Sequence, residues 1–338
     1  MKAMVLGKPS SVSLQDVEQP HADTGNSIVR VTHSGICGTD LKIFTGGIPT
    51  KYPLIMGHEM IGEVVEAASS ETPKAGSRVI VDPVTFCGDC FHCDIGQTQL
   101  CPNGGLIGRD ADGGFAEYVA APPGNIYAMP DGIGDREAPL VQVLTTVMHA
   151  QQMAAISPGD TVVILGLGVS GLLHVQLAKA RGAKSIIGIT RSAWKREVAD
   201  SIGADLTLAP DDTTKDRVLE ATNGLGADVV IESAGKLAVL AQAMDLVRLG
   251  GRVLGFGIHT QTEGALPFYD MYFKEIQFIN ARAATQKDFA ACLEMCGSGA
   301  IDLTPLISDV VPLDQLDKAL EMVGTDAPQR MKIILENT

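Results

Sequence analysis

From about Asp160 onward, short apolar segments alternate with amphipathic ones, which is the pattern of parallel strands joined by helices. Strands that alternate with helices form a doubly wound parallel sheet, and the ligand of such a sheet lies at the carboxyl ends of the strands. We therefore expect an α/β domain here. Six candidate strands can be recognised: Thr161–Leu165, Ser185–Thr190, Asp205–Leu208, Asp228–Ile231, Gly251–Phe256 and Gln277–Ile279.

The chain before about Ala121 has a different rhythm, with short β-type runs separated by glycine and proline turns. Such a pattern is typical of a mostly antiparallel β domain. Beyond about Lys287, two helical segments and a last strand, Met331–Leu335, follow. The candidate strands of the first half are Ile28–Val31, Ile61–Val65, Arg78–Val81 and Phe115–Val119.

Size and charge limit the classes of protein to be considered. With 338 residues, 45% of them hydrophobic and 20% charged, the chain is expected to form about two globular domains. Its net charge of −14 disfavours binding to nucleic acid or to an anionic membrane surface. The N-terminus lacks the apolar core of a signal peptide, and no run approaches the ~18 apolar residues of a membrane span. We expect a cytoplasmic protein that has no membrane partner.

Four cysteines have the spacing of metal ligands. Cys87, Cys90, Cys93 and Cys101 form a C-x2-C-x2-C-x7-C motif in a loop rich in glycine and polar residues. Four thiolates can complete the tetrahedral shell of Zn²⁺ and leave no open position, which favours a structural zinc site over a reaction centre. An iron–sulfur cluster or a pair of disulfides would be the alternatives, and the absence of an export signal disfavours the disulfides.

A glycine motif follows the first strand of the second half. The strand ending at Leu165 runs directly into Gly166-Leu167-Gly168-Val169-Ser170-Gly171 and then into an apolar helical segment. In this context Gly166 permits the tight turn, Gly168 lets the backbone approach a pyrophosphate, and Gly171 lets the helix pack on the strand. Val169, between them, is also expected to bind the cofactor. The motif predicts a dinucleotide site rather than only a tight turn.

The residues after the next strand indicate which dinucleotide is bound. An NAD-binding domain usually carries an acidic residue there to accept hydrogen bonds from the ribose hydroxyls, but this chain has Thr190, Arg191 and Ser192, followed by Lys195. The missing carboxylate and the added cations suit a 2′-phosphate. We expect a preference for NADP over NAD. Alternatively, Arg191 is a solvated loop cation and both cofactors are accepted.

Two further segments carry metal-ligand side chains: Gly35-Ile36-Cys37-Gly38-Thr39-Asp40 and Gly57-His58-Glu59. Together with the cysteine motif and the glycine turn, they resemble the zinc-dependent medium-chain alcohol dehydrogenases. The resemblance covers essentially the whole chain, including Phe115-Ala116-Glu117-Tyr118. The short loop Asp82-Pro83 before Cys87 is most similar to the polyol and threonine dehydrogenase branch.

The resemblance implies a GroES-like, mostly antiparallel β catalytic domain at residues 1–148 and 287–338, and a Rossmann domain at residues 149–286. It further implies that Cys37, His58 and Glu59 hold a catalytic zinc, that Asp40 orients His58, and that Thr39 takes the proton of the substrate hydroxyl. Zinc with an open position would lower the pKa of an alcohol so that hydride can pass to the nicotinamide. Glu59 could also exchange with a water molecule at the metal.

Two positions depart from the pattern of the family. Gln142 stands where the family places a Cys, Asp or Glu ligand, and a neutral amide is a weaker donor. Lys42 stands where many members carry the histidine of a proton relay. A cationic lysine cannot accept a proton. Either burial depresses its pKa, or it only contacts cofactor oxygens and water completes the proton relay, and we favour the second alternative.

These features predict a zinc-dependent, NADP-preferring alcohol dehydrogenase or carbonyl reductase acting on a small secondary alcohol, polyol or ketone. The alternatives are a zinc-independent reductase of the same fold and a catalytically silent nucleotide-binding protein that keeps only the structural zinc. Arg109 could anchor substrate or form a solvated salt bridge. From the resemblance we also expect a homodimer or homotetramer, formed where strands Gly251–Phe256 and Gln277–Ile279 continue a sheet between subunits.

Overall fold

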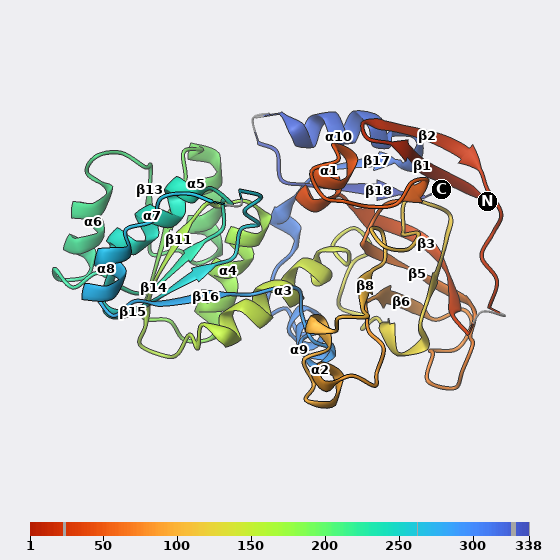
Figure 1. The fold of residues 1–338 in the computed structure, drawn as a ribbon, viewed down its shortest axis with the longest axis horizontal. Coiled ribbons are helices and arrows are strands. Elements are labelled where there is room, and N and C mark those ends of the chain that lie inside the picture. The colour runs from red at the N-terminus through yellow and green to blue at the C-terminus, as the bar shows by residue number, and fades with distance from the viewer. Residues whose placement is uncertain (23–24, 262, 326–328, 338) are drawn as a thin grey trace. The chain divides into compact units, whose positions relative to one another are not determined.

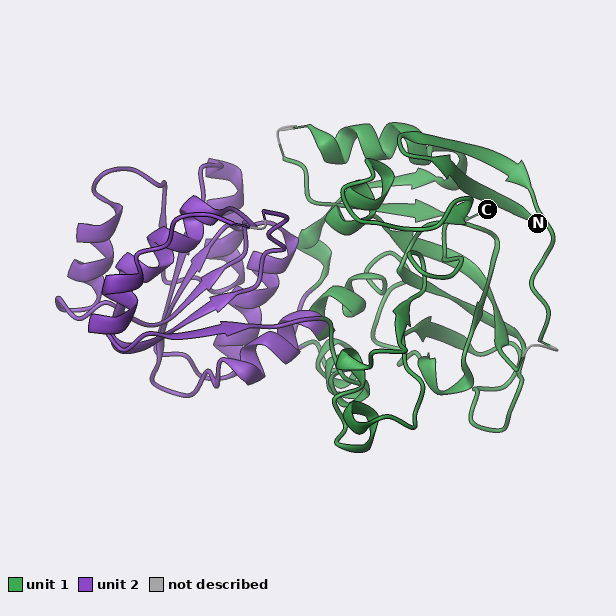
Figure 2. Ribbon diagram, viewed as in Figure 1, with its two compact units in different colours: residues 1–145, 283–299, 303–338 green, residues 146–282, 300–302 purple. Residues whose placement is uncertain are grey.

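The computed structural model describes residues 1–22, 25–261, 263–325 and 329–337, and the chain divides into two compact units (Figure 2). Unit 1 comprises Met1–Thr145, Ala283–Gly299 and Leu303–Thr338, and unit 2 comprises Thr146–Arg282 and Ala300–Asp302. From the sequence, the breaks were expected after residues 148 and 286. None of the helices in the described residues is both long enough and apolar enough to span a lipid bilayer.

Unit 2 contains a six-stranded parallel sheet with the order β13-β12-β11-β14-β15-β16 (Figure 1). The order reverses between β11 and β14, as in a doubly wound nucleotide-binding sheet. The predicted α/β domain is therefore confirmed. The strands are β11 (Thr161–Leu165), β12 (Ser185–Ile189), β13 (Leu206–Leu208), β14 (Ala227–Glu232), β15 (Val247–Gly255) and β16 (Gln277–Asn280).

Apolar side chains cover both faces of this sheet, as parallel strands require. Val162 and Ile164 of β11 are fully buried on one face, while Val163 and Leu165 join the core on the other. Helix α7 packs on β14 and β15 with Leu240 and its neighbours. The helices of this unit are α4 (Val169–Ala180), α5 (Ala193–Ile202), α6 (Thr214–Ala221), α7 (Leu237–Leu246) and α8 (Phe268–Phe273), and α3 (Leu140–Met153) crosses the first boundary.

Strand β15 begins earlier than its predicted start at Gly251. Val247 already pairs with Ala227, and a register shift then precedes the regular pairing of Arg252 with Val229. Gly250, with φ +66°, lies inside this irregular stretch, and β15 continues through Gly250 and Gly251.

Unit 1 is mainly antiparallel, as predicted. Its largest sheet has the order β10-β6-β5-β3-β18-β17, with β9 also paired to β3, and only β17 and β18 run parallel. A second sheet has the order β2-β1-β4, and β7 pairs with β8. The strands are β1 (Lys2–Lys8), β2 (Ser11–Asp16), β3 (Ser27–Gly35), β4 (Leu54–Ile55), β5 (Glu59–Glu66), β6 (Arg78–Val81), β7 (Val84–Thr85), β8 (Gly105–Leu106), β9 (Tyr118–Ala121), β10 (Ile126–Ala128), β17 (Ile307–Pro312) and β18 (Lys332–Glu336).

Besides the start of α3, the described part of unit 1 contains four α-helices. They are α1 (Gly38–Phe44), α2 (Phe91–Asp94), α9 (Gln286–Gly297) and α10 (Leu316–Gly324), of which α10 contacts α1, β17 and β18. The chain therefore returns from unit 2 to finish this unit. As a result, β18 near the C-terminus lies directly beside β3 from the N-terminal part.

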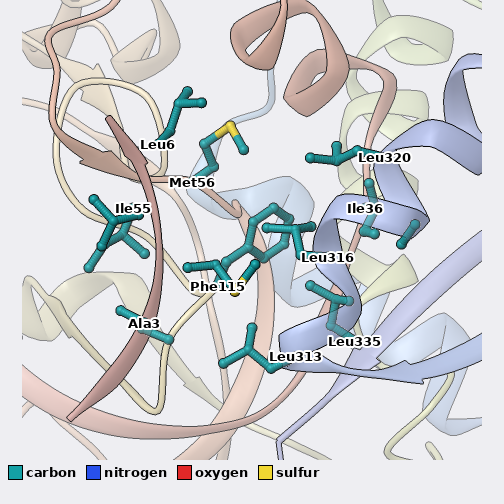
Figure 3. Close-up of a cluster of buried hydrophobic side chains, with 14 of the residues drawn as sticks. Ala3, Leu6, Ile36, Ile55, Met56, Phe115, Leu313, Leu316, Leu320 and Leu335 are labelled. Carbon is teal, nitrogen blue, oxygen red and sulfur yellow. The ribbon is translucent and has the colours of Figure 1, made fainter. Parts of the chain in front are cut away.

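The prediction of a strand over Phe115–Val119 was wrong at its first residues, because β9 begins at Tyr118. Phe115 instead exchanges hydrogen bonds with Met4 and Met56 and is fully buried. Its ring lies at the centre of an apolar cluster that joins β1 to helix α10 (Figure 3). The labelled members of this cluster are Ala3, Leu6, Ile36, Ile55, Met56, Phe115, Leu313, Leu316, Leu320 and Leu335.

Candidate metal and cofactor sites

The structure brings the three expected ligands of a catalytic metal together. Atoms of the Cys37 thiol, the His58 imidazole and the Glu59 carboxylate all lie within 4.8 Å of one another, although the sequence separates Cys37 from the other two by 20 residues or more. His58 and Glu59 are buried and Cys37 is half-buried. A thiolate, an imidazole and a carboxylate are ligands that zinc accepts, so this donor set fits Zn²⁺.

Asp40 connects the two segments that carry these ligands. Cys37 is the N-cap of α1, and its backbone N–H donates to Asp40 Oδ2 at 2.8 Å. The other carboxylate oxygen, Oδ1, lies 3.1 Å from His58 Nδ1. With Nδ1 donating to a fully buried carboxylate, His58 presents Nε2 for a metal. Asp40 therefore fixes both the start of α1 and the orientation of the ring.

Gly57 places His58 at the start of β5. Its φ of +96° is unfavourable for other residues, and a Cβ atom there would lie 2.5 Å from the ring of Phe115. The Gly57 carbonyl also accepts a hydrogen bond from Gly114 at 2.9 Å. The apolar cluster around Phe115 thus supports the turn that directs His58 toward Cys37.

The Glu59 carboxylate lies over Gly35 of the neighbouring strand β3, where an added Cβ would be 2.2 Å from Oε2. Lys332, the first residue of β18, donates from Nζ to both carboxylate oxygens, at 2.8 and 2.7 Å, and to the carbonyl of Ile36 at 3.1 Å. Both partners are buried, with side-chain exposures of 5% for Lys332 and 0% for Glu59. The ion pair therefore neutralises the charge of Glu59 within the site.

Two effects oppose each other at His58. Burial lowers the pKa of the imidazole, but the charges of Asp40 and Cys37 and their hydrogen bonds outweigh burial and raise the pKa well above its usual value of 6.5. The surroundings of the ring therefore favour positive charge. A metal cation bound at Nε2 would meet the same favourable field that a proton does.

The remaining predicted residues of this region are placed as follows. Thr39 and Lys42 both lie in helix α1 beside Asp40, and each is half-buried. Gln142 lies in the first turn of α3 and is buried, with its carbonyl accepting from the hydroxyl of Thr145 at 2.7 Å. Arg109 forms a salt bridge with the adjacent Asp110, at 2.6 Å.

The four cysteines of the metal motif converge. Their sulfurs are separated by 3.4 Å (Cys87–Cys101), 3.5 Å (Cys90–Cys93), 3.8 Å (Cys90–Cys101) and 4.0 Å (Cys87–Cys93). Four sulfurs around one zinc at about 2.3 Å are roughly 3.8 Å apart, so the cluster fits a closed tetrahedral site. All four are free thiols, which argues against the disulfide alternative.

The glycine turn of unit 2 has the geometry that a dinucleotide requires. Gly166 has φ +95°, and a Cβ on Gly171 would lie 1.9 Å from the Gly166 carbonyl oxygen, so helix α4 meets the turn without a side chain between them. Gly168 caps α4 without a side-chain hydrogen bond, and a Cβ there would meet no atom within 4 Å. The amides at the start of α4, beginning with Val169, are therefore open to a pyrophosphate.

The residues expected near the adenosine ribose lie together after β12. Ser192 caps α5 by accepting from the Lys195 backbone N–H at 3.4 Å, which leaves its hydroxyl hydrogen available to a ligand. Arg196, which sequence reasoning missed, donates to the carbonyls of Thr190 and Arg191 at 2.8 and 3.1 Å. The loop and the first turns of α5 therefore carry three basic residues, Arg191, Lys195 and Arg196. Arg196 lies one helical turn after Ser192, and this spacing could have identified it from the sequence as a residue of the same loop.

Comparison with known protein families gives two matches. Residues 23–131 match the model of the alcohol dehydrogenase GroES-like domain, and residues 168–298 match that of the zinc-binding dehydrogenases. Sorbitol dehydrogenase of Halalkalibacterium halodurans is 30% identical over 99% of both chains. D-arabitol-phosphate dehydrogenase of Enterococcus avium is 31% identical over 95% of this chain and 93% of its own length.

Solved structures of similar fold include dehydrogenases with a bound nicotinamide cofactor. A zinc-binding dehydrogenase from Sinorhizobium meliloti, solved with NADP, superposes with a TM-score of 0.92 at 32% identity and covers 99% of this chain and 98% of its own. A dehydrogenase from Escherichia coli, solved with NADH, has a TM-score of 0.92 at 28% identity and covers 99% of both chains. Relatives of this fold therefore bind either dinucleotide.

The Lys332–Glu59 pair generates a testable prediction. Replacing Lys332 with Met leaves a buried carboxylate without its partner, which should lower the free energy of unfolding by about 3–5 kcal/mol in urea denaturation. The double variant Lys332→Met/Glu59→Gln removes both charges and should recover most of this loss. Losses that simply add in the double variant would show that the two side chains are not coupled.

Proposed function

The chain belongs to the zinc-dependent medium-chain alcohol dehydrogenases, and we propose that it oxidises a secondary hydroxyl of a polyol or sugar acid, or reduces the corresponding ketone, with a preference for NADP. The convergence of Cys37, His58 and Glu59 within 4.8 Å carries the proposal. A zinc-independent reductase would not need this donor set. The same argument disfavours a silent protein that keeps only the four-cysteine site.

Each residue of the candidate metal site in unit 1 has a distinct role in this proposal. Cys37 and His58 bind Zn²⁺, and Asp40 keeps the imidazole oriented for it. When bound there, zinc would act as a Lewis acid and lower the pKa of the substrate hydroxyl. Thr39, in the first turn of α1, receives the proton of that hydroxyl and releases its own proton to water. Lys332 limits the negative charge that Glu59 contributes as a ligand.

The proposal also assigns roles to Gln142 and Lys42, the two positions that depart from the family pattern. Gln142 replaces an anionic ligand by a neutral amide, so the metal is held less tightly and stays more electrophilic. Lys42 contacts oxygens of the cofactor rather than passing a proton.

The substrate class rests on the names of relatives. Proteins 30–32% identical to this chain are named as dehydrogenases of sorbitol, D-arabitol phosphate and L-galactonate, all of which carry several hydroxyl groups. A polyol, a sugar phosphate or a sugar acid is therefore the class to examine first. Arg109 is a candidate for contacting an acidic group of such a substrate, in exchange for its salt bridge with Asp110.

The direct test is to measure oxidation of polyols, sugar phosphates and sugar acids, and reduction of simple ketones and keto-sugars. The absorbance of the reduced nicotinamide reports turnover with NADP and with NAD. We expect turnover of at least one polyol-type substrate, its loss on treatment with a chelator, and its return with Zn²⁺. His58→Gln should remain folded and be inactive. Turnover that resists chelation and survives in His58→Gln would contradict a zinc-dependent reaction.

The NADP preference depends on the loop after β12. Thr190→Asp places a carboxylate where it repels a 2′-phosphate and accepts from ribose hydroxyls, so the ratio of kcat/KM for NADP over NAD should fall by about 10- to 100-fold. Thr190→Asn is the control, because asparagine has the size of aspartate but no charge. It should change the ratio of kcat/KM values far less. An unchanged ratio in Thr190→Asp would mean that this loop does not select the cofactor.

We further propose that unit 2 forms a homo-oligomer through β16. This strand is at the edge of the sheet, so its outer backbone groups can pair with a second copy (Figure 1). Helix α8 precedes it and exposes four aromatic side chains, Phe268, Tyr269, Tyr272 and Phe273, by 66–82%. Such a patch is large for a surface that meets only water.

Sedimentation velocity tests this assembly. Tyr272→Glu combined with Phe273→Glu should convert a dimer or tetramer to smaller species, because it places two charges in the apolar patch. Leu225→Glu is a matched control, since Leu225 is 71% exposed before β14. A wild-type protein that sediments as a monomer would contradict the proposal.

A further inference from the structure

A further buried carboxylate lies at the carboxyl edge of the parallel sheet. Glu232 is the last residue of β14, is fully buried and pairs in register with Leu165, the residue before the glycine turn. His259 follows β15, the next strand in the sheet. Its Nε2 lies 3.1 Å from Glu232 Oε2. Neither residue has a part in the function described above.

Glu232 joins two loops. Its Oε1 accepts hydrogen bonds from the backbone N–H groups of Ala234 at 2.8 Å and Lys236 at 3.4 Å, which belong to the loop after β14. Its Oε2 binds His259 in the loop after β15. The loops meet closely, since a Cβ on Gly257 would lie 2.2 Å from Gly235 N. One carboxylate therefore fixes the backbone at the ends of two adjacent strands.

These loops border the dinucleotide turn. A Cβ on Gly166 would lie 3.1 Å from the Ala234 Cβ, and the hydroxyls of Ser170 and Ser233 are 3.2 Å apart. In a doubly wound sheet each half binds one mononucleotide. The glycine turn and β12 serve the adenosine half. The ends of β14 and β15 therefore face the nicotinamide half.

His259 has an unused hydrogen-bonding atom. Its Nδ1 is buried and has no hydrogen-bond partner among the residues that the structure describes. A neutral imidazole that donates from Nε2 to Glu232 has a lone pair at Nδ1, so this nitrogen is an acceptor. A buried acceptor without a donor is costly and calls for an explanation. A ligand that brings a hydrogen-bond donor would provide one.

We infer that His259 is a cofactor-binding residue that accepts a hydrogen bond at Nδ1 from the nicotinamide half of the dinucleotide, and that Glu232 is the positioning residue that sets its tautomer. The nicotinamide half offers two kinds of donor, the ribose hydroxyls and the carboxamide N–H. Both lie beyond the pyrophosphate. The inference requires a nicotinamide dinucleotide but is independent of whether NADP or NAD is preferred.

The test is a set of dissociation constants measured by calorimetry on the full-length, zinc-replete protein. ADP, ADP-ribose, NADH and NADPH are the four probes, because they add in turn the second ribose, the nicotinamide and the 2′-phosphate. His259→Gln keeps an N–H donor toward Glu232 but has no acceptor at the position of the imidazole Nδ1. Glu232→Gln presents an amide to Nε2 and so reverses the tautomer. His259→Ala serves if either variant does not fold.

In His259→Gln we expect the dissociation constants of NADH and NADPH to rise roughly three- to tenfold while that of ADP stays unchanged. Glu232→Gln should give the same pattern, and the double variant should lose no more than either single variant. Weaker ADP-ribose binding would assign the contact to the ribose hydroxyls, and unchanged ADP-ribose binding would assign it to the carboxamide.

Two results would overturn the inference. Unchanged NADH and NADPH binding would mean that the Glu232–His259 pair only joins the two loops. An equal loss for ADP would mean that the variants perturb the whole nucleotide site. Because binding is measured without substrate and with both cofactors, neither result depends on the proposed substrate class or on the preference for NADP.

Discussion

The candidate metal site depends on the two hydrogen bonds of the Asp40 carboxylate. One oxygen caps the helix that begins after Cys37, and the other orients His58 from a different part of the chain. The bond between Asp40 and His58 is buried, so it does not have to compete with water, and the bond to the Cys37 N–H is partly buried. Without them, the thiol and the imidazole would belong to two independent segments. The apolar cluster around Phe115 adds rigidity by supporting the turn at Gly57.

The buried charges around this carboxylate explain why a divalent cation suits the site. With Cys37 as thiolate, the residues Cys37, Asp40 and Glu59 carry three negative charges, and Lys332 offsets one of them. A buried excess of two negative charges is unfavourable, and one Zn²⁺ balances it. An anionic residue in place of Gln142 would leave the loaded site with an excess negative charge. The neutral amide is thus consistent with the pairing of Glu59 and Lys332.

Features that depend on local spacing could be predicted from the sequence. The glycine turn, the cysteine motif and the rhythm of strands each arise within about 30 residues, and the fold class follows from them. Lys332 could not be found in this way, because it meets Glu59 across 273 positions through the pairing of β18 with β3. Phe115 was assigned to a strand because it begins a short β-type run, whereas in the structure its ring packs against Gly57 and β9 begins only at Tyr118. Glu232 and His259 likewise become neighbours only when β14 and β15 pair.

The central claim is that the frame around Asp40 holds a zinc ion distinct from the one held by the four cysteines. Anomalous diffraction at the zinc edge, on crystals of the metal-replete protein, tests this claim most directly. The account predicts two peaks per chain, one between Cys37 and His58 and one among Cys87, Cys90, Cys93 and Cys101. A single peak at the four cysteines, with none at Cys37 in zinc-replete crystals, would contradict it.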